Sequence, residues 1–189
     1  MIATIDGKIL SGGRDESVHD LGSKHDKLMM KRIEASADAV LLGAQTLRAT
    51  PLSWSPQTVR RYVVTRSGDV PEGHRYLTEG SATILSGEVD WLRALQGMRD
   101  QGVDRLLVMG GSLVNAQLFA LGLVDEIFLT VAPKIRLGGD IPTIADGEAL
   151  PRESIQEFSL VEHHAVGSEL FLRYRREGAD LRLNSEATA

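Results

Sequence analysis

The chain has 189 residues, of which 42% are apolar and 25% charged, and its net charge is −5. This length and composition fit one globular domain with a single core. The acidic balance disfavours a nucleic-acid partner, because phosphate binding depends on Lys and Arg. No run of residues has the ~20 apolar positions of a membrane span. The absence of cysteine excludes disulfides, thiolate catalysis and cysteine-ligated zinc, and it suits a cytoplasmic location.

The first residues, MIATIDGKIL, predict a strand that ends at the turn-forming pair Asp6-Gly7. Either this strand is short, or the numbering begins partway along a longer strand. Asp6 has two interpretations. It is a turn former, which is the commonest use of Asp beside Gly, or it is a partly desolvated acid with a raised pKa.

Strands and helices then alternate along the chain. Short continuous apolar runs predict strands buried on both faces at residues 37–42, 62–64, 83–85 and 106–109. Apolar residues at helical spacing lie between them: Met29, Ile33 and Ala37; Trp91, Leu95 and Met98; Val114, Leu118 and Leu121. This order predicts an α/β fold in which parallel strands are covered by helices on both faces.

The last third of the chain has a different pattern. Residues 124–131 predict a strand with little sign of a crossover after it, and Leu170, Leu172 and Tyr174 alternate with more polar positions. Residues 158–162 are the expected partner of that second strand. We therefore expect a mixed sheet with an antiparallel C-terminal end. We also expect one domain over residues 1–176 and a frayed tail over residues 177–189.

Two glycine turns each follow a predicted buried strand and precede a predicted helix. The first contains Gly43 and Thr46, and the second contains Gly110, Gly111, Ser112 and Leu113. Bare backbone N–H groups at the start of a helix can bind an anion, and Thr46 and Ser112 can add hydroxyl donors. Alternatively, each glycine only permits a tight turn. Two such turns in one small domain favour a ligand with two phosphates.

These turns fit neither common nucleotide motif. The pattern G-x-G-x-x-G is absent, and so is G-x-x-x-x-G-K-[ST]. An ordinary Rossmann dehydrogenase and a P-loop NTPase are therefore disfavoured. The close pair His163 and His164 would point to opposite faces of a strand, so no metal site is expected.

A third turn follows the predicted strand at residues 62–64. It contains Thr65, Arg66, Ser67 and Gly68. An Arg beside two hydroxyls suits the 2′-phosphate that distinguishes NADPH from NADH. The alternative is an ordinary exposed turn.

Several motifs in one order carry a family resemblance. They are residues 5–9, 37–46, 109–113, 122–127 and 131–134, followed by Gly138-Gly139. Together they resemble the reductase domain of the riboflavin-biosynthesis deaminase-reductases, a relative of dihydrofolate reductase, from Met1 to about Tyr174. The resemblance implies a three-layer, dihydrofolate reductase-like α/β fold with a mixed, mainly parallel central sheet. It also implies an NADPH-dependent reductase that is usually a homodimer. Our hypothesis is that the apolar strand at residues 124–131 forms the dimer interface.

The resemblance implies roles for individual residues. Asp6 would lie beside the substrate and the nicotinamide, where it would position or protonate the sugar-derived group. The substrate would be 2,5-diamino-6-ribosylamino-4-pyrimidinone 5′-phosphate or its deaminated form, whose ribosyl group is reduced to ribityl. The NADPH site would comprise Gly43, Thr46, Thr50, Thr65, Arg66, Ser67, Gly68, Gly110, Gly111, Ser112 and Leu113. The substrate side would comprise Lys8, Arg48 and Met109.

The sequence departs from the family pattern on the substrate side. Met109 stands where the family commonly has a Glu that bonds the substrate's ring. A family Lys that helps to bind substrate phosphate would fall just ahead of Met1, so we expect the natural chain to begin earlier. Arg48 is a candidate replacement for a downstream phosphate-binding Arg. The deaminase half is absent, because its zinc signature needs cysteines.

Three alternatives remain open at this point. One is a reductase of another small heterocycle or carbonyl, of pterin or folate type. The second is a module that binds the cofactor without turnover. The third is a structural dimer in which the glycines are only turns.

Overall fold

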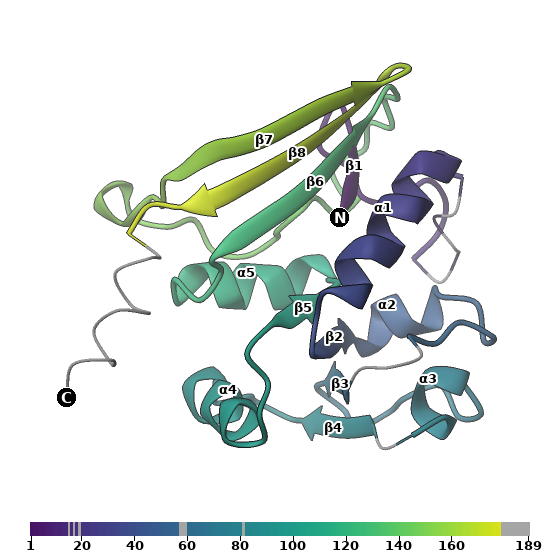
Figure 1. The fold of residues 1–189 in the computed structure, drawn as a ribbon, viewed down its shortest axis with the longest axis vertical. Coiled ribbons are helices and arrows are strands. Elements are labelled where there is room, and N and C mark those ends of the chain that lie inside the picture. Colours follow the sequence, from purple (N-terminus) through teal and green to yellow (C-terminus); the bar gives the residue numbers. More distant parts are fainter. Residues whose placement is uncertain (15, 17, 19, 57–59, 81, 179–189) are drawn as a thin grey trace.

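A computed structural model describes the whole chain except residues 15, 17, 19, 57–59, 81 and 179–189 (Figure 1). The elements are β1 (Ile2–Thr4), α1 (Lys24–Ala35), β2 (Ala39–Gly43), α2 (Ala44–Arg48), β3 (Arg60–Thr65), α3 (Arg75–Thr78), β4 (Ala82–Ser86), α4 (Trp91–Asp100), β5 (Leu106–Val108), α5 (Ser112–Ala120), β6 (Glu126–Ala132), a 3₁₀ turn (Arg152–Ser154), β7 (Phe158–Val166) and β8 (Glu169–Arg176). Most of the tail expected at residues 177–189 lies outside the described residues.

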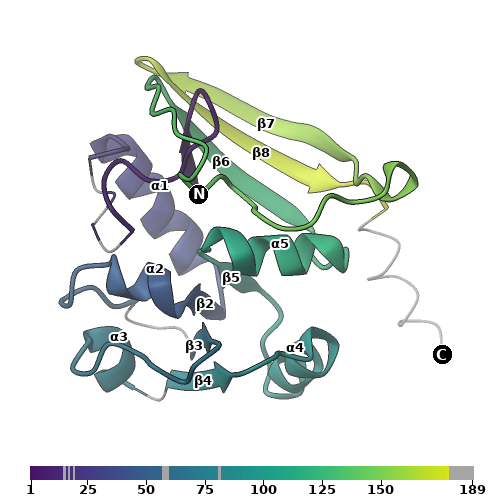
Figure 2. The ribbon, with the colours of Figure 1, turned by 180° about the vertical axis from the view of Figure 1, so that it is seen from behind.

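The strands form two hydrogen-bonded sheets. In the first, the order is β4-β3-β2-β5 and all neighbours are parallel; we call it the parallel sheet. In the second, the order is β1-β6-β8-β7; β1 is parallel to β6, and β8 is antiparallel to both β6 and β7. We call it the mixed sheet. The predicted α/β class and its antiparallel C-terminal end are therefore confirmed. Helix α5 lies between the two sheets (Figures 1 and 2).

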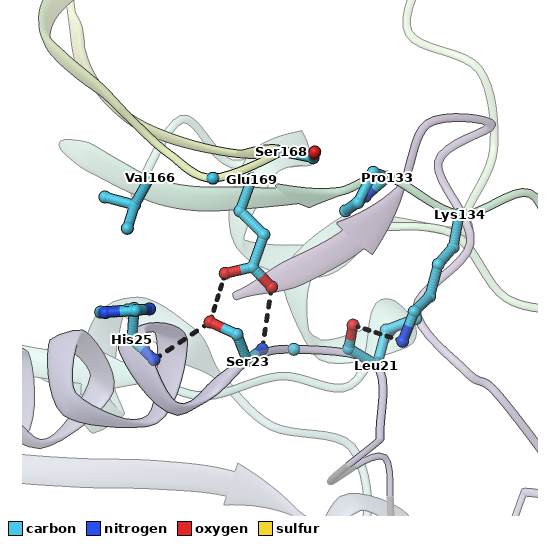
Figure 3. Close-up of a pocket in the computed structure, with 10 residues that line it drawn as sticks. Leu21, Ser23, His25, Pro133, Lys134, Val166, Ser168 and Glu169 are labelled. Atoms are coloured by element: carbon cyan, nitrogen blue, oxygen red, sulfur yellow. Dashed lines mark hydrogen bonds between the residues drawn. The ribbon is translucent and has the colours of Figure 1, made fainter.

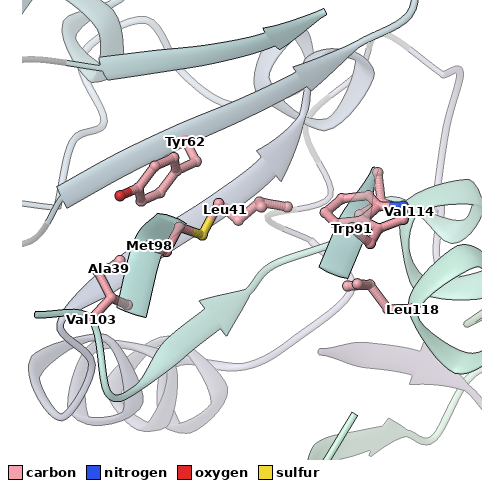
Figure 4. Close-up of a cluster of buried hydrophobic side chains, with 8 residues drawn as sticks. All are labelled: Ala39, Leu41, Tyr62, Trp91, Met98, Val103, Val114 and Leu118. Carbon is pink, nitrogen blue, oxygen red and sulfur yellow. The ribbon is translucent and has the colours of Figure 1, made fainter. Parts of the chain in front are cut away.

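Helices cover both faces of the parallel sheet. On one face, α4 and α5 contribute Trp91, Met98, Val114 and Leu118 to a cluster around Leu41 of β2 (Figure 4). On the other face, α2 and α3 pack Ala44, Leu47 and Tyr76 against Val40, Leu42 and Val63. Alternate residues of β2 thus point into different clusters, and every residue of β2 is buried. This arrangement gives the three predicted layers.

A polar network closes the second of these clusters. The buried Tyr76 hydroxyl donates to the carbonyl of Val40 at 2.8 Å and accepts from the amide of Tyr62 at 3.2 Å. Burial raises the pKa of Tyr76 well above its ordinary value. The same burial lowers the pKa of His74, whose ring accepts a hydrogen bond from the amide of Tyr76. Both groups are therefore neutral at pH 7 and belong to the core.

Several sequence expectations about burial and helix length are wrong. The run at residues 106–109 was expected to be buried on both faces, but β5 is an edge strand that is only half-buried, and Leu121 caps α5 instead of lying within it. The strand at residues 83–85 was expected to be buried on both faces, but it lies in β4, at the edge of the parallel sheet, and Ile84 is 44% exposed. A short apolar run does not reveal whether its strand is central or at an edge. Ala37 was placed on a helix face, but α1 ends at Ala35 with Ser36 as its cap.

Candidate active site

The two predicted glycine turns meet at one edge of the parallel sheet. β2 and β5 are neighbouring parallel strands, so their carboxyl ends lie side by side. The amide of Gly43 donates to the carbonyl of Gly110 at 2.8 Å. A Cβ on Gly43 would lie 3.3 Å from Val114 Cγ2 and 3.4 Å from the amide nitrogen of Gly111, so a side chain there would crowd the turn.

The hydroxyl of Thr46 lies against the second turn. A Cβ on Gly111 would stand only 3.1 Å from Thr46 Oγ1. Gly110 has a φ of +99°, which favours glycine, and the Gly110–Gly111 peptide bond is cis. The edge therefore presents bare backbone and a hydroxyl at the start of α5. This chemistry fits the phosphates of a dinucleotide.

Thr50 and Leu113 were also predicted to bind the cofactor, but their surroundings differ from those of the two glycine turns. The Thr50 hydroxyl donates to the carbonyl of Thr46 at 2.9 Å, and the Thr50 carbonyl faces His74. Its polar atoms thus fasten the end of α2. Leu113 is 61% exposed in the first turn of α5.

The third predicted turn follows β3, which is the other neighbour of β2. The Thr65 hydroxyl donates to the carbonyl of Asp69 at 3.1 Å, and the Asp69 amide donates to Ser67 Oγ at 3.2 Å. Gly68 has a φ of +84°, as the turn requires. Arg66 and Ser67 are exposed on it.

Arg48 binds this same turn. Its Nη2 atom donates to Asp69 Oδ2 at 2.5 Å and to the Asp69 carbonyl at 3.1 Å. Arg48 was predicted to lie on the substrate side. The structure instead joins it to the turn that carries the candidate 2′-phosphate ligands, because α2 ends beside the carboxyl end of β3.

Asp6 is an ionised anchor for a neighbouring loop. Its carboxylate accepts hydrogen bonds from the Thr4 hydroxyl at 2.6 Å and from the amides of Arg136 and Leu137 at 3.1 and 2.8 Å. The Thr4 bond, followed by these amide bonds, lowers the pKa of Asp6 from 3.8 to about 2. Of the two interpretations of Asp6, the acid with a raised pKa is therefore wrong, because hydrogen bonds to the charged form outweigh desolvation.

A chain of polar groups connects Lys8 to the start of α5. Lys8 forms an isolated bridge with Thr143, and its Nζ donates to the carbonyl of Ile141 at 3.0 Å. The Thr143 hydroxyl donates to Asp146 at 2.6 Å, and the Asp146 amide donates to the carbonyl of Ser112 at 3.3 Å. Lys8, which follows β1, is thus linked to Ser112 of the glycine turn.

Asp146 is charged at the centre of this chain. Desolvation is the largest effect and raises its pKa, but hydrogen bonds from Thr143 and from the Ser112 hydroxyl, together with the charge of Lys8, lower it overall. The Asn115 side chain donates to the carbonyl of Ile144 at 2.7 Å and fastens the same segment to α5. The predicted Ser112 donor is thus engaged by a carboxylate.

Met109 directly follows β5 and is half-buried. Its amide donates to the carbonyl of Leu41 at 3.0 Å, and its side chain packs against the cluster that contains Leu42 and Leu47. The side chain therefore contributes to the core beneath α2. A thioether offers no strong hydrogen bond to a ring from this position.

Two hollows flank the segment that follows β6. One, of about 370 Å³, adjoins Asp6, since Arg136 lines it; Arg14, Glu16 and Asp140 line it as well. The other, of about 400 Å³, lies between the start of α1 and the β7–β8 hairpin (Figure 3). Neither hollow includes a glycine turn.

Polar residues that line the second hollow are hydrogen-bonded to other parts of the protein. The buried Glu169 accepts from the amide and the hydroxyl of Ser23 at 2.8 and 2.5 Å, and Ser23 caps α1 by accepting from the amide of His25 (Figure 3). Lys134 donates to the carbonyls of Asp20 and Leu21. The Glu169–Ser23 bonds hold the hairpin against the start of α1, and Lys134 holds the segment after β6 against residues 20 and 21.

The sequence interpretation missed several residues at the site. Asp146, Thr143, Asp69 and Arg14 were not singled out, although Asp146-Gly147 is a turn signal. Their positions depend on contacts between segments that are distant in the chain. Within the part of the chain that the structure describes, no three His, Cys, Asp or Glu residues gather as a possible metal site. No helix there has the length and apolar character needed to cross a bilayer.

The fold and the strand-end site define an α/β protein of the dihydrofolate reductase-like class. Two solved structures share the fold. Acinetobacter baumannii RibD is 16% identical with a TM-score of 0.75, and the match covers 93% of this chain and 56% of that one. A pyrimidine reductase-like protein from Corynebacterium diphtheriae is 18% identical with a TM-score of 0.69, and the match covers 93% of this chain and 89% of that one. The sequence matches the RibD C-terminal domain family over residues 1–172, and the chain belongs to that family.

Curated relatives have informative names. The 2,5-diamino-6-ribosylamino-4(3H)-pyrimidinone 5′-phosphate reductase of Methanothermobacter thermautotrophicus is 26% identical over 93% of this chain and 95% of its own length. The riboflavin biosynthesis protein RibD of Mycobacterium tuberculosis is 32% identical over 76% of this chain but only 43% of its own length. The family resemblance read from the sequence is confirmed.

Proposed function

We propose that this protein is an NADPH-dependent reductase of riboflavin biosynthesis that converts the ribosyl group of a ribosylaminopyrimidine 5′-phosphate into ribityl. The family membership and the name of a relative that spans nearly the same length support the reaction class. The observation that supports a bound cofactor is that Gly43 and Gly110 meet at the carboxyl ends of β2 and β5. Both turns present glycine backbone at the start of a helix, which is the chemistry that binds phosphate.

Residues of this chain would bind the cofactor in two groups. The turns at Gly43 and Gly110, with the Thr46 hydroxyl, would hold the pyrophosphate. The turn after β3, with Arg66 and Ser67, would hold the 2′-phosphate. When bound, NADPH supplies the hydride that reduces the sugar-derived carbon. The protein's contribution is to orient the two reactants and to neutralise their charges.

Asp6 acts in this proposal as a carboxylate. A group with a pKa of about 2 has no proton to donate near pH 7. Its bonds to Thr4, Arg136 and Leu137 leave it one remaining role toward substrate, which is to accept a hydrogen bond. We therefore favour positioning by Asp6 over protonation by it.

The substrate phosphate has a candidate place beside Asp6. Arg14 and Arg136 line the hollow there, and guanidinium groups suit phosphate. Glu16 and Asp140 line it as well, so its net charge is balanced. Lys8, linked to Asp146, adds a further cation on this side of the site.

Met109 favours a second candidate function. Because its side chain packs into the core and offers no carboxylate to an aminopyrimidine, the substrate could instead be another small heterocycle or carbonyl, of pterin or folate type. The two functions differ in a direct assay. NADPH oxidation would be followed with the ribosylaminopyrimidine phosphate, its deaminated form, dihydropterins and simple ketones.

The first experiment is a titration of the purified protein with NADPH and NADH, followed by Trp54 and Trp91 fluorescence and by calorimetry. Tight NADPH binding with turnover of the pyrimidine is the expected result. Binding without turnover of any tested substrate would favour a cofactor-binding module. No binding of either nucleotide would leave the glycines as structural turns and remove the proposal.

We further propose a homodimer in the cytoplasm. Leu160 and Leu170, on β7 and β8, are 49% and 45% exposed, which supports an apolar contact on the mixed sheet. β6, which contains most of the predicted interface strand at residues 124–131, lies between β1 and β8, so it can contribute a face but no free edge. Sedimentation at the monomer mass across micromolar concentrations would exclude this dimer. The cytoplasmic location stays a prediction.

A further inference from the structure

Arg48 and Asp69 form an ion pair on the candidate 2′-phosphate turn. Arg48 ends α2, and Asp69 follows the Arg66-Ser67-Gly68 stretch. The guanidinium Nη2 contacts both the carboxylate and the carbonyl of Asp69. The carbonyl of Asp69 also accepts from Thr65, and its amide donates to Ser67. The amide, the carbonyl and one carboxylate oxygen of Asp69 are thus engaged within this turn or with Arg48.

This pair places opposite charges where nucleotide selection would occur. A carboxylate beside an adenosine ribose favours a free 2′-hydroxyl and repels a 2′-phosphate, whereas an arginine favours the phosphate. Arg48 neutralises Asp69, so the turn does not present an isolated negative charge. The side chains are 30% and 72% exposed, and ion pairs exposed to this degree are weak. A phosphate can therefore compete with Asp69 for Arg48.

We infer that the Arg48–Asp69 pair determines the preference for NADPH over NADH. When NADPH binds, Arg48 leaves Asp69 and pairs with the 2′-phosphate. The negative charge of Asp69 then repels the phosphate and lowers its affinity. The inference deepens the proposed function and rests on it. It also moves Arg48 from the substrate to the cofactor, as a specificity-determining residue.

The test measures dissociation constants by calorimetry for NADPH, NADH and adenosine 2′,5′-bisphosphate. The variants are Arg48→Gln, Arg48→Lys, Asp69→Asn and the double variant Arg48→Gln/Asp69→Asn, which keeps the wild-type net charge. Arg152→Gln, in the exposed 3₁₀ turn beside the mixed sheet, is a control with the same change of charge as Arg48→Gln. Thermal melts of each variant establish that it is folded.

Arg48→Gln should weaken NADPH and the bisphosphate by about tenfold or more and change NADH by less than about twofold. Arg48→Lys should retain part of the preference, because it keeps the charge but loses the planar fork. Asp69→Asn should raise the ratio of NADPH to NADH affinity by about threefold, since it removes a negative charge. The double variant should fall between the two single variants, and Arg152→Gln should match the wild type.

Three results would overturn the inference. Equal losses for NADPH and NADH in Arg48→Gln would mean that the pair only supports the turn. An unchanged NADPH affinity in a folded Arg48→Gln variant would show that Arg48 does not contact the phosphate. If the wild type prefers NADPH and either of these holds, the inference fails while the proposed function stands. If the wild type binds neither nucleotide, both fail.

Discussion

The amide of Gly43 and the carbonyl of Gly110 lie 2.8 Å apart and are joined by a hydrogen bond. This bond connects two turns that are far apart in the chain and brings two helix starts to one edge of the parallel sheet. The contact depends on glycine, because a side chain at residue 43 would press on Val114 and on the backbone of Gly111. It brings the two predicted phosphate turns together at this edge.

Gly43→Ala should therefore weaken NADPH binding by about tenfold, because the added methyl group displaces the turn from the pyrophosphate. The free energy of unfolding should fall by about 1 kcal/mol from the crowding. Calorimetric titration and denaturant unfolding measure the two effects. An unchanged affinity would show that this turn does not contact the cofactor.

Gly97→Ala is the matched control. Gly97 lies inside α4, and a Cβ there would meet no atom within 4 Å. Alanine should stabilise the helix by about 1 kcal/mol, because glycine has a larger conformational entropy in the unfolded chain. Its NADPH affinity should equal that of the wild type. A similar affinity loss in both variants would point to a general effect of added methyl groups.

Asp6 should make the free energy of unfolding depend on pH in the acid range. Its pKa is about 2 in the folded protein and 3.8 ordinarily, so the folded state binds fewer protons between these values. The contribution is fully present above about pH 4 and is lost as the pH falls through about 2. Denaturant unfolding of the wild type and Asp6→Asn should differ at neutral pH and converge in acid. A pH-independent difference would argue against an ionised, hydrogen-bonded Asp6.

Lys8→Gln should raise the KM for the phosphorylated substrate by about tenfold and leave the NADPH dissociation constant within about twofold. Lys8 lies on the Asp6 side of the site, where its charge acts on Asp146. Lys27→Gln, on the exposed surface of α1, is the control with an equal change of charge. Equal weakening of substrate and cofactor by Lys8→Gln would show that Lys8 supports the whole site.

Leu41→Ala should destabilise the protein by about 2–5 kcal/mol, because it leaves a cavity in the cluster around β2. Ile84→Ala should cost less than about 1 kcal/mol, since Ile84 is 44% exposed on the edge strand. Denaturant midpoints of the two variants test the contrast between a central and an edge strand. Comparable losses would contradict the observed strand order.

The local patterns of the sequence predicted the order and type of the elements. Continuous apolar runs predicted β2 and β3, and period-two alternation predicted β8, because these patterns reflect which faces of a strand are buried. They did not distinguish the exposed β4 from the buried β2, since both runs are short and apolar. The glycine-to-helix turns were also visible, because bare backbone before a helix is a local property.

The sequence by itself determined the α/β class, the glycine turns and the family resemblance, since each depends on neighbouring residues and their order. Only the tertiary structure decided which distant groups meet. It joined Arg48 to Asp69, connected Lys8 to Ser112 through Thr143 and Asp146, and brought the amides of Arg136 and Leu137 to the Asp6 carboxylate. The physical reason is that hydrogen bonds and electrostatic interactions act over a few ångströms, and folding alone sets those distances.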